Sequence, residues 1–219
     1  LKNFSPVRAG LQTGDNKRFV RQWFEVSWIK TSISDASMIT NTRRKWFPYN
    51  KGGEYRKWYG NLEDVVNWEN DGEELLHERP KSVIRSPQFY FKKSVTWSFI
   101  SSSNFGVRYS DATGLFDVAG SSAFPDENMA FYVTGFLCSA IAPFFMKALN
   151  PTLNFQVSNV ASLPLIIAAS KSDIDGIVEK IIGCHRLDWN SYETSWDFTT
   201  LPLLQPDHRA ETLEGTYTT

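Results

Sequence analysis

The chain has 219 residues, of which 42% are hydrophobic, 21% charged and 15% aromatic, and its formal net charge is -1. This composition is typical of a globular protein and argues against a disordered or fibrous one. No apolar run reaches the roughly 18 residues of a membrane-spanning helix, and the first residues, LKNFSPVRAG, lack the pattern of a signal peptide.

Short strands and turns are predicted for residues 1 to about 162. Residues 18–28 suit a strand, although a helix is an alternative, and residues 52–61 and 64–71 suit two strands joined at Gly60-Asn61-Leu62. Residues 73–79 favour one or two helical turns. Farther along, apolar side chains alternate as they do in half-buried strands. They are Phe89, Phe91, Val95, Trp97, Phe99, Val107 and Tyr109.

Helical spacing begins near residue 126, with apolar residues at positions 133, 136, 137, 141, 144, 145 and 149. Pro143 predicts a kink or the start of a second helix, and Asn150-Pro151 predicts its end. Residues 154–166 suit a short strand and a turn.

The last third of the chain predicts one amphipathic helix, over residues 173–187 with Ser172 as its cap. The whole pattern predicts an α+β fold. We expect a twisted β-rich domain with packed helices over residues 1–165, a helical spacer element over residues 166–200, and an extended or poorly ordered tail over residues 201–219.

Patterns of catalytic and metal-binding residues are missing from the sequence. His77, His185 and His208 are isolated, without Cys or acidic residues at metal-ligand spacing. There is no nucleophile elbow, phosphate-binding loop or dinucleotide-binding pattern. Cys138 and Cys184 are lone cysteines, which favours buried thiols in a reducing, cytoplasmic compartment. We therefore expect the chain to bind a partner and to hold no metal.

Charge is distributed unevenly along the chain. Residues 1–60 hold twelve Lys or Arg and four Asp or Glu, whereas residues 61–160 hold seven and eleven, and residues 161–219 hold four and nine. A basic first part indicates a surface for a polyanion, although ordinary charge clustering is the alternative.

The stretch NTRRKWFPYNKGGEYRKWYGN, residues 41–61, combines cations with large rings. Cations neutralise phosphates, and rings stack on unpaired bases or support the stems of basic side chains. We expect Trp46, Phe47, Trp58 and Tyr59 to form the scaffold of a hairpin whose lysines and arginines hold a DNA backbone. The alternative is a half-buried hairpin with solvated charges.

Several blocks of the sequence resemble the C-terminal half of the BREX, or phage-growth-limitation X, adenine-specific DNA methyltransferases. The blocks are GLQTGDNKRFVRQWFEV, KWFPYNKGGEYRKWYGNLEDVVNWENDGEE, VTWSFISSSNFGVRYSDATGLFDVAGSSAFP, GFLCSAIAPFFMKALNPTLNFQVSNVASLPL and DWNSYETSWDF. They also resemble the target-recognition domains of single-chain type II restriction–modification enzymes and, more distantly, type I specificity subunits. The resemblance covers about residues 5–205.

The resemblance implies a target-recognition domain of a phage-defence or restriction–modification methyltransferase, which would methylate the N6 of adenine with S-adenosylmethionine. The family's Asn-Pro-Pro-Tyr motif has no counterpart, because Asn150-Pro151 is followed by Thr152-Leu153, and the glycine-rich cofactor motif is missing. We therefore expect no catalytic residue and no cofactor in this chain, which lacks an initial Met and suits a piece of a longer protein. The expected partners are double-stranded DNA, the methyltransferase domain and other defence proteins, and not a membrane.

The residues expected to contact DNA are basic. The first choices are Arg43, Arg44, Lys45, Lys51, Arg56 and Lys57, and the second choices are Lys17, Arg18, Lys92, Lys93 and Arg108. The large apolar residues expected in the core are Trp97, Phe99, Phe116, Phe136 and Phe145. A protein- or carbohydrate-binding β domain is the alternative function, since eight tryptophans suit a sugar-stacking face. The basic first part argues against it, because neutral glycans need no cations.

Overall fold

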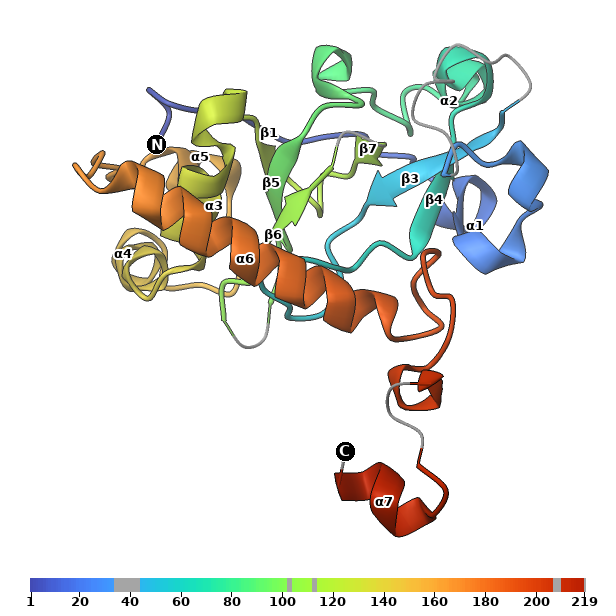
Figure 1. Ribbon diagram of the computed structural model, residues 1–219. Coiled ribbons are helices and arrows are strands. Elements are labelled where there is room, and N and C mark those ends of the chain that lie inside the picture. The colour runs from blue at the N-terminus through green and yellow to red at the C-terminus, as the bar shows by residue number, and fades with distance from the viewer. Residues whose placement is uncertain (34–43, 102–103, 112–113, 207–209, 219) are drawn as a thin grey trace.

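The computed structural model describes residues 1–33, 44–101, 104–111, 114–206 and 210–218. In this part of the chain, two four-stranded sheets carry helices on their faces and edges, which confirms the predicted α+β class (Figure 1). The first sheet has the order β1-β8-β5-β6, and all its neighbours are antiparallel. Its strands are Val7–Arg8 (β1), Ser94–Trp97 (β5), Val107–Ser110 (β6) and Ser122–Ala123 (β8).

The second sheet has the order β2-β4-β3-β7 and is antiparallel except between β3 and β7. Its strands are Val20–Gln22 (β2), Trp46–Asn50 (β3), Asp64–Asn67 (β4) and Leu115–Phe116 (β7). The helices are Asn16–Phe19 (α1), Glu73–His77 (α2), Ala130–Cys138 (α3), Ile141–Leu149 (α4), Val157–Ala161 (α5), Lys171–Asn190 (α6) and Leu213–Thr218 (α7). In Figure 1, α6 crosses the front of the molecule and α7 projects away from its body.

The predicted hairpin is wrong in its position. β4 forms within residues 64–71 as expected, but its partner is β3, with Trp46 opposite Asn67. Residues 52–61 do not form the other strand, since only Trp58 makes a bridge there, to Arg108. Trp58 has a φ of 72° and several glycines of this segment also have positive φ, a backbone shape that a regular strand does not accept. Residues 51–63 are therefore the long connection between β3 and β4.

Two predictions, the short strand and turn over residues 154–166 and the start of the following helix, need correction. Residues 154–166 contain α5, which spans only five residues and is too short to show a helical period in the sequence. α6 begins at Lys171, with Ser170 and not Ser172 as its N-terminal cap. Residues 201–219, expected to be an extended or poorly ordered tail, contain α7 and a 3-10 turn at Pro202–Leu204.

The apolar stretch over residues 127–149 forms two helices, as Pro143 predicts. α4 begins at Ile141, and Pro143 lies in its first turn, where a missing amide proton costs little. In the described residues, no single helix is long and apolar enough to cross a membrane. The pair Glu127–Cys138 and Ile141–Leu149 has the length and composition only when joined across a 69° bend.

The main core lies between the first sheet and α3 to α5. Trp97 is fully buried there and donates a hydrogen bond from Nε1 to the carbonyl of Phe155 at 2.8 Å. Phe116 is buried in a second cluster, under the second sheet. Phe136 and Phe145 are partly buried against the main core, and Phe99 is half-buried. The predicted core residues are thus buried or at the edge of the core.

α6 lies along the body of the domain and packs against α3. Val178 of α6 meets α3 at Gly135, where an added Cβ would lie 2.7 Å from Cγ2 of Val178. Near its C-terminal end, α6 is held by ion pairs between Arg186 and Asp111 at 2.9 Å and between Arg56 and Asp188 at 3.2 Å. α6 is therefore packed against the rest of the described structure.

An added methyl group is expected to have opposite effects on stability at Gly135 of α3 and at Gly183 of α6. Gly183→Ala is expected to raise the free energy of unfolding by about 0.5–1 kcal/mol, since it lies inside α6 with open space around it. Gly135→Ala is expected to lower it by about 1–3 kcal/mol, because the methyl group meets Val178. Urea unfolding measures both, and equal stabilisation by the two variants would contradict this packing.

Candidate nucleic-acid interface

Arg108, one of the predicted DNA contacts, lies inside the protein. Its side chain is in β6, and the residue is only 1% exposed. Nη2 donates to the carbonyl of Gly52 at 3.0 Å and Nη1 to Oγ of Ser98 at 3.4 Å. Burial lowers the pKa of Arg108 to about 10. A buried guanidinium cannot reach a DNA phosphate, so the prediction for Arg108 is corrected: it fixes the loop that follows β3.

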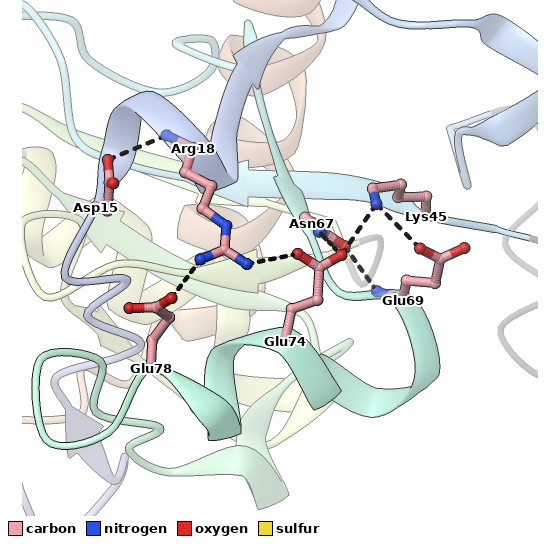
Figure 2. Close-up of polar contacts among 7 residues, drawn as sticks. All are labelled: Asp15, Arg18, Lys45, Asn67, Glu69, Glu74 and Glu78. Carbon is pink, nitrogen blue, oxygen red and sulfur yellow. Dashed lines mark hydrogen bonds and ion pairs between the residues drawn. The ribbon is translucent and has the colours of Figure 1, made fainter.

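Arg18 and Lys45 lie on either side of Glu74 (Figure 2). Arg18 forms ion pairs with Glu78 and, at 3.2 Å, with Glu74. Lys45 Nζ lies 3.1 Å from carboxylate oxygens of both Glu69 and Glu74. Burial acts to lower the pKa of Lys45, but the hydrogen bonds and charges of these two carboxylates outweigh it, and the pKa is raised. Both cations therefore have acidic neighbours that offset their charge.

Three other first-choice cations, Arg44, Arg56 and Lys57, also contact the protein itself. Arg44 donates to the carbonyl of Thr31, and Lys57 donates to that of Cys138 at 2.9 Å. Arg56 pairs with Asp188, as described above, and lies 4.9 Å from the ring centroid of Trp189. Lys51 is half-buried, and Arg43 lies outside the described residues.

A second group of cations lies on the loop that follows α2. Residues 79–93, RPKSVIRSPQFYFKK, hold five basic residues, and the chain has no acidic residue between Glu78 and Asp111. Arg79, Lys81, Lys92 and Lys93 are exposed, and Arg85 is half-buried. Exposed basic residues on a loop are suited to binding a polyanion, since loops carry many binding residues.

This loop packs against residues 8–18, which add further cations. Gln12 and Val83 form an antiparallel bridge, and Arg85 Nη1 donates to Oε1 of Gln12 at 3.2 Å. Arg8 and Lys92 each lie 5.4 Å from the ring centroid of Phe89. We call the combined set the basic loop surface. It consists of Arg8, Lys17, Arg79, Lys81, Arg85, Lys92 and Lys93.

Arg79, Lys81 and Arg85 were not predicted as DNA contacts, because the net charge of a long block hides the basic run that contains them. The block 61–160 includes the acidic residues that precede Arg79, and their sum hides the basic run. A count over a short window of about 15 residues would have found residues 79–93. Lys17, Lys92 and Lys93 are the predicted candidates that the structure places on this surface, where Lys93 forms an ion pair with Glu127.

A cavity of about 460 Å³ lies elsewhere, between the 53–63 loop and the end of α6. Its lining includes Glu54, Glu63 and Asp64, together with Tyr55 and Arg56. Burial raises the pKa of Asp64 to about 6, although the charge of Lys51 acts in the opposite direction. Three carboxyl groups make this face unfavourable for a phosphate backbone, which leaves the basic loop surface as the candidate interface.

Asp64→Asn is expected to raise the free energy of unfolding at pH 7 by about 1–2 kcal/mol, a value reduced from the full pKa shift because the side chain is partly exposed. The pKa of Asp64 rises from 3.8 to about 6 on folding. The folded state therefore binds the proton more tightly, and stability falls as pH rises from about 4 to about 6. Asp64→Asn removes this pH-dependent loss of stability. The urea midpoints of the natural chain and of the variant, compared at about pH 4 and about pH 6, measure the effect. An equal stabilisation by the variant at both pH values would contradict the raised pKa of Asp64.

Comparison with known proteins identifies relatives of this region. No family model matches the chain. It is 39% identical over 227 residues to the adenine-specific methyltransferase PglX of Lacticaseibacillus casei (strain Zhang), a match that covers 99% of this chain and 19% of that protein. It is 35% identical over 200 residues to the adenine-specific methyltransferase BrxX of Escherichia coli O9:H4 (strain HS), covering 90% and 16%. The chain is homologous to one region of PglX- and BrxX-type proteins.

This homology confirms the resemblance that the sequence blocks indicated. The chain spans less than a fifth of the length of the PglX and BrxX proteins that it matches. The matched region includes nearly the whole chain, so the sheets and α6 both belong to the part shared with PglX.

S-adenosylmethionine is the cofactor that the resemblance implies for a methyltransferase. A Rossmann-like cofactor site lies at the carboxyl ends of parallel strands. The described residues do not fit this arrangement, since their sheets are antiparallel apart from the short β3–β7 pair. In the same part of the chain, no three His, Cys, Asp or Glu side chains come together to hold a metal ion.

Proposed function

We propose that this chain is the DNA target-recognition domain of a site-specific adenine-N6 methyltransferase of the PglX and BrxX type. The observation that carries the proposal is the basic loop surface. The two segments that form it, residues 8–18 and 79–93, contain eight basic residues and one acidic residue. Homology to one region of adenine-specific methyltransferases supports a DNA substrate for this surface.

The basic side chains would fix the register of the domain on the DNA backbone. Lys81, Lys92 and Lys93 are exposed and suited to phosphates, which they neutralise as point charges. Such contacts position a protein but carry no sequence information. Other side chains of the same surface must read the bases.

Arg79 and Gln88 are candidates for base reading, since both are exposed on the 79–93 loop. A guanidinium donates two hydrogen bonds to the O6 and N7 of guanine, and a glutamine amide pairs with the N6 and N7 of adenine. Each good bidentate contact contributes about 1–3 kcal/mol of discrimination against the wrong base.

The chemistry would belong to another part of the protein. In a PglX- or BrxX-type protein, that part would bind the methyl donor, which is S-adenosylmethionine in our proposal, and would take the target adenine out of the duplex. This chain would hold the DNA in place beside it. The acidic cavity near α6 would face away from the DNA backbone, which it repels, so that the duplex binds in one orientation.

The salt dependence of duplex binding tests the proposal. If about six cations of the basic loop surface each contact a phosphate, the logarithm of the association constant should fall with the logarithm of salt concentration at a slope near -5. Fluorescence anisotropy of a labelled duplex measures this slope. Absence of duplex binding at about 50 mM salt, or binding that does not depend on salt, would overturn the proposal.

A further inference from the structure

A second cavity, of about 460 Å³, opens beside the basic loop surface. It lies between residues 89–93 and the segment that follows β8. The rings of Phe89, Phe91 and Phe124 line it, together with Pro125. The ring centroids of Phe89 and Phe124 are 4.7 Å apart, and Phe124 is buried, so these walls belong to the packed structure. Much of the cavity wall is therefore apolar and flat-sided.

The rim of this cavity is charged. Lys92 and Lys93 of the basic loop surface line it, together with Asp126 and Glu127. Lys93 forms an ion pair with Glu127, whereas Lys92 lies over the ring of Phe89. Asp126 is exposed, and its carboxylate makes no capping hydrogen bond to the turn that follows it.

This combination matches the parts of a nucleotide. Aromatic walls stack with or pack against a nucleobase without selecting its sequence. Lysines at the rim neutralise the phosphates on either side of it. The volume lies within the range of small-molecule sites, about 300–1,000 Å³.

We propose that this cavity binds one unpaired nucleobase of the bound DNA, with Lys92 and Lys93 on the neighbouring phosphates. The inference rests on the proposed function, because the DNA must first reach the basic loop surface. A base inside an intact duplex is stacked and cannot enter. An enzyme that extrudes a base also opens its pair, and an unpaired nucleotide is then available.

The test compares three labelled duplexes in anisotropy titrations of the full chain. One is fully paired, one carries a single bulged adenine, and one carries a bulged abasic residue at the same position. Both bulges disturb the backbone, but only the first supplies a base for the cavity. The adenine bulge is expected to bind about 5- to 100-fold more tightly than the abasic bulge, as a stacked base contributes in other proteins.

Two substitutions of Asp126 test whether the preference for the adenine bulge depends on the cavity. Asp126→Trp puts a large ring at the rim and removes a negative charge, so it should remove the preference for the adenine bulge without weakening binding of the paired duplex. Asp126→Ala removes the same charge but leaves the cavity open, so it should keep a preference of fivefold or more. Asp126 suits this comparison because its side chain is exposed and not used as a cap.

The outcomes separate the two proposals. Loss of the adenine preference in Asp126→Trp alone supports binding of the base in the cavity. Equal affinity of the natural chain for the two bulges, with salt-dependent binding of the paired duplex, overturns this inference and leaves the proposed function standing. A preference that survives in Asp126→Trp also overturns it. If none of the three DNAs binds, both proposals fall.

Discussion

Charge reversal at Arg79, Lys81 and Lys92 is expected to lower the affinity of this chain for duplex DNA by about 100- to 1,000-fold at about 0.1 M salt. All three side chains are exposed on the basic loop surface. Each phosphate contact adds about 0.9 to the salt slope, so loss of the phosphate contacts of Lys81 and Lys92 should also flatten that slope by about 1.8. Anisotropy titrations over a series of salt concentrations measure both changes.

The control is a triple variant with the same change of net charge. Lys2, Lys147 and Lys180 are exposed but lie outside the two segments of the basic loop surface, with Lys147 on α4 and Lys180 on α6. Changing them to glutamate should lower affinity far less, because distant exposed charges are screened beyond about 8–10 Å. An equal loss in both triple variants would mean that net charge alone matters and would contradict the assigned interface.

Trp97→Ala is expected to lower the free energy of unfolding by about 3–5 kcal/mol, a large part of the stability of an ordinary domain. Trp97 is fully buried in the main core, and its indole proton is bonded to the carbonyl of Phe155. The variant leaves a cavity and an unsatisfied carbonyl group. Urea unfolding followed by circular dichroism measures the loss.

Trp97→Phe is the matched control for this prediction. It keeps an aromatic ring in the core but loses the hydrogen bond, so its cost should be smaller, about 1–3 kcal/mol. A cost below about 1 kcal/mol for Trp97→Ala would contradict the central place of this side chain in the core.

Two strands of the first sheet, β5 and β6, were predictable because their apolar residues alternate. Val95 and Trp97 of β5, and Val107 and Tyr109 of β6, are buried as this period indicates. The burial of the residues between them was not predictable from alternation, since every residue of these two strands is buried. Arg108 points to the face that alternation assigns to solvent, but the loop after β3 covers that face. Only tertiary packing decides its burial.

The partners of the DNA-contact candidates within the protein were not predictable for a related reason. The sequence shows that Lys45 and Arg18 are cations, but not that Glu74 lies between them, because Arg18 and Glu74 are 56 residues apart. Arg56 likewise meets Asp188 only when α6 packs against the domain, 132 residues later. The local sequence determines where charges occur, whereas the fold determines which charges cancel.

The pairing of β1 with β8 affects how this protein is made in the cell. Val7 of β1 lies opposite Ala123 of β8. β1 therefore has no partner strand until more than a hundred further residues have been synthesised. At about 5–20 residues per second, a ribosome needs about 6–25 s for that length. During this time Val7 and Leu11, both buried in the folded state, are exposed on the nascent chain. The yield of folded protein therefore depends on what shields this segment while the rest is translated.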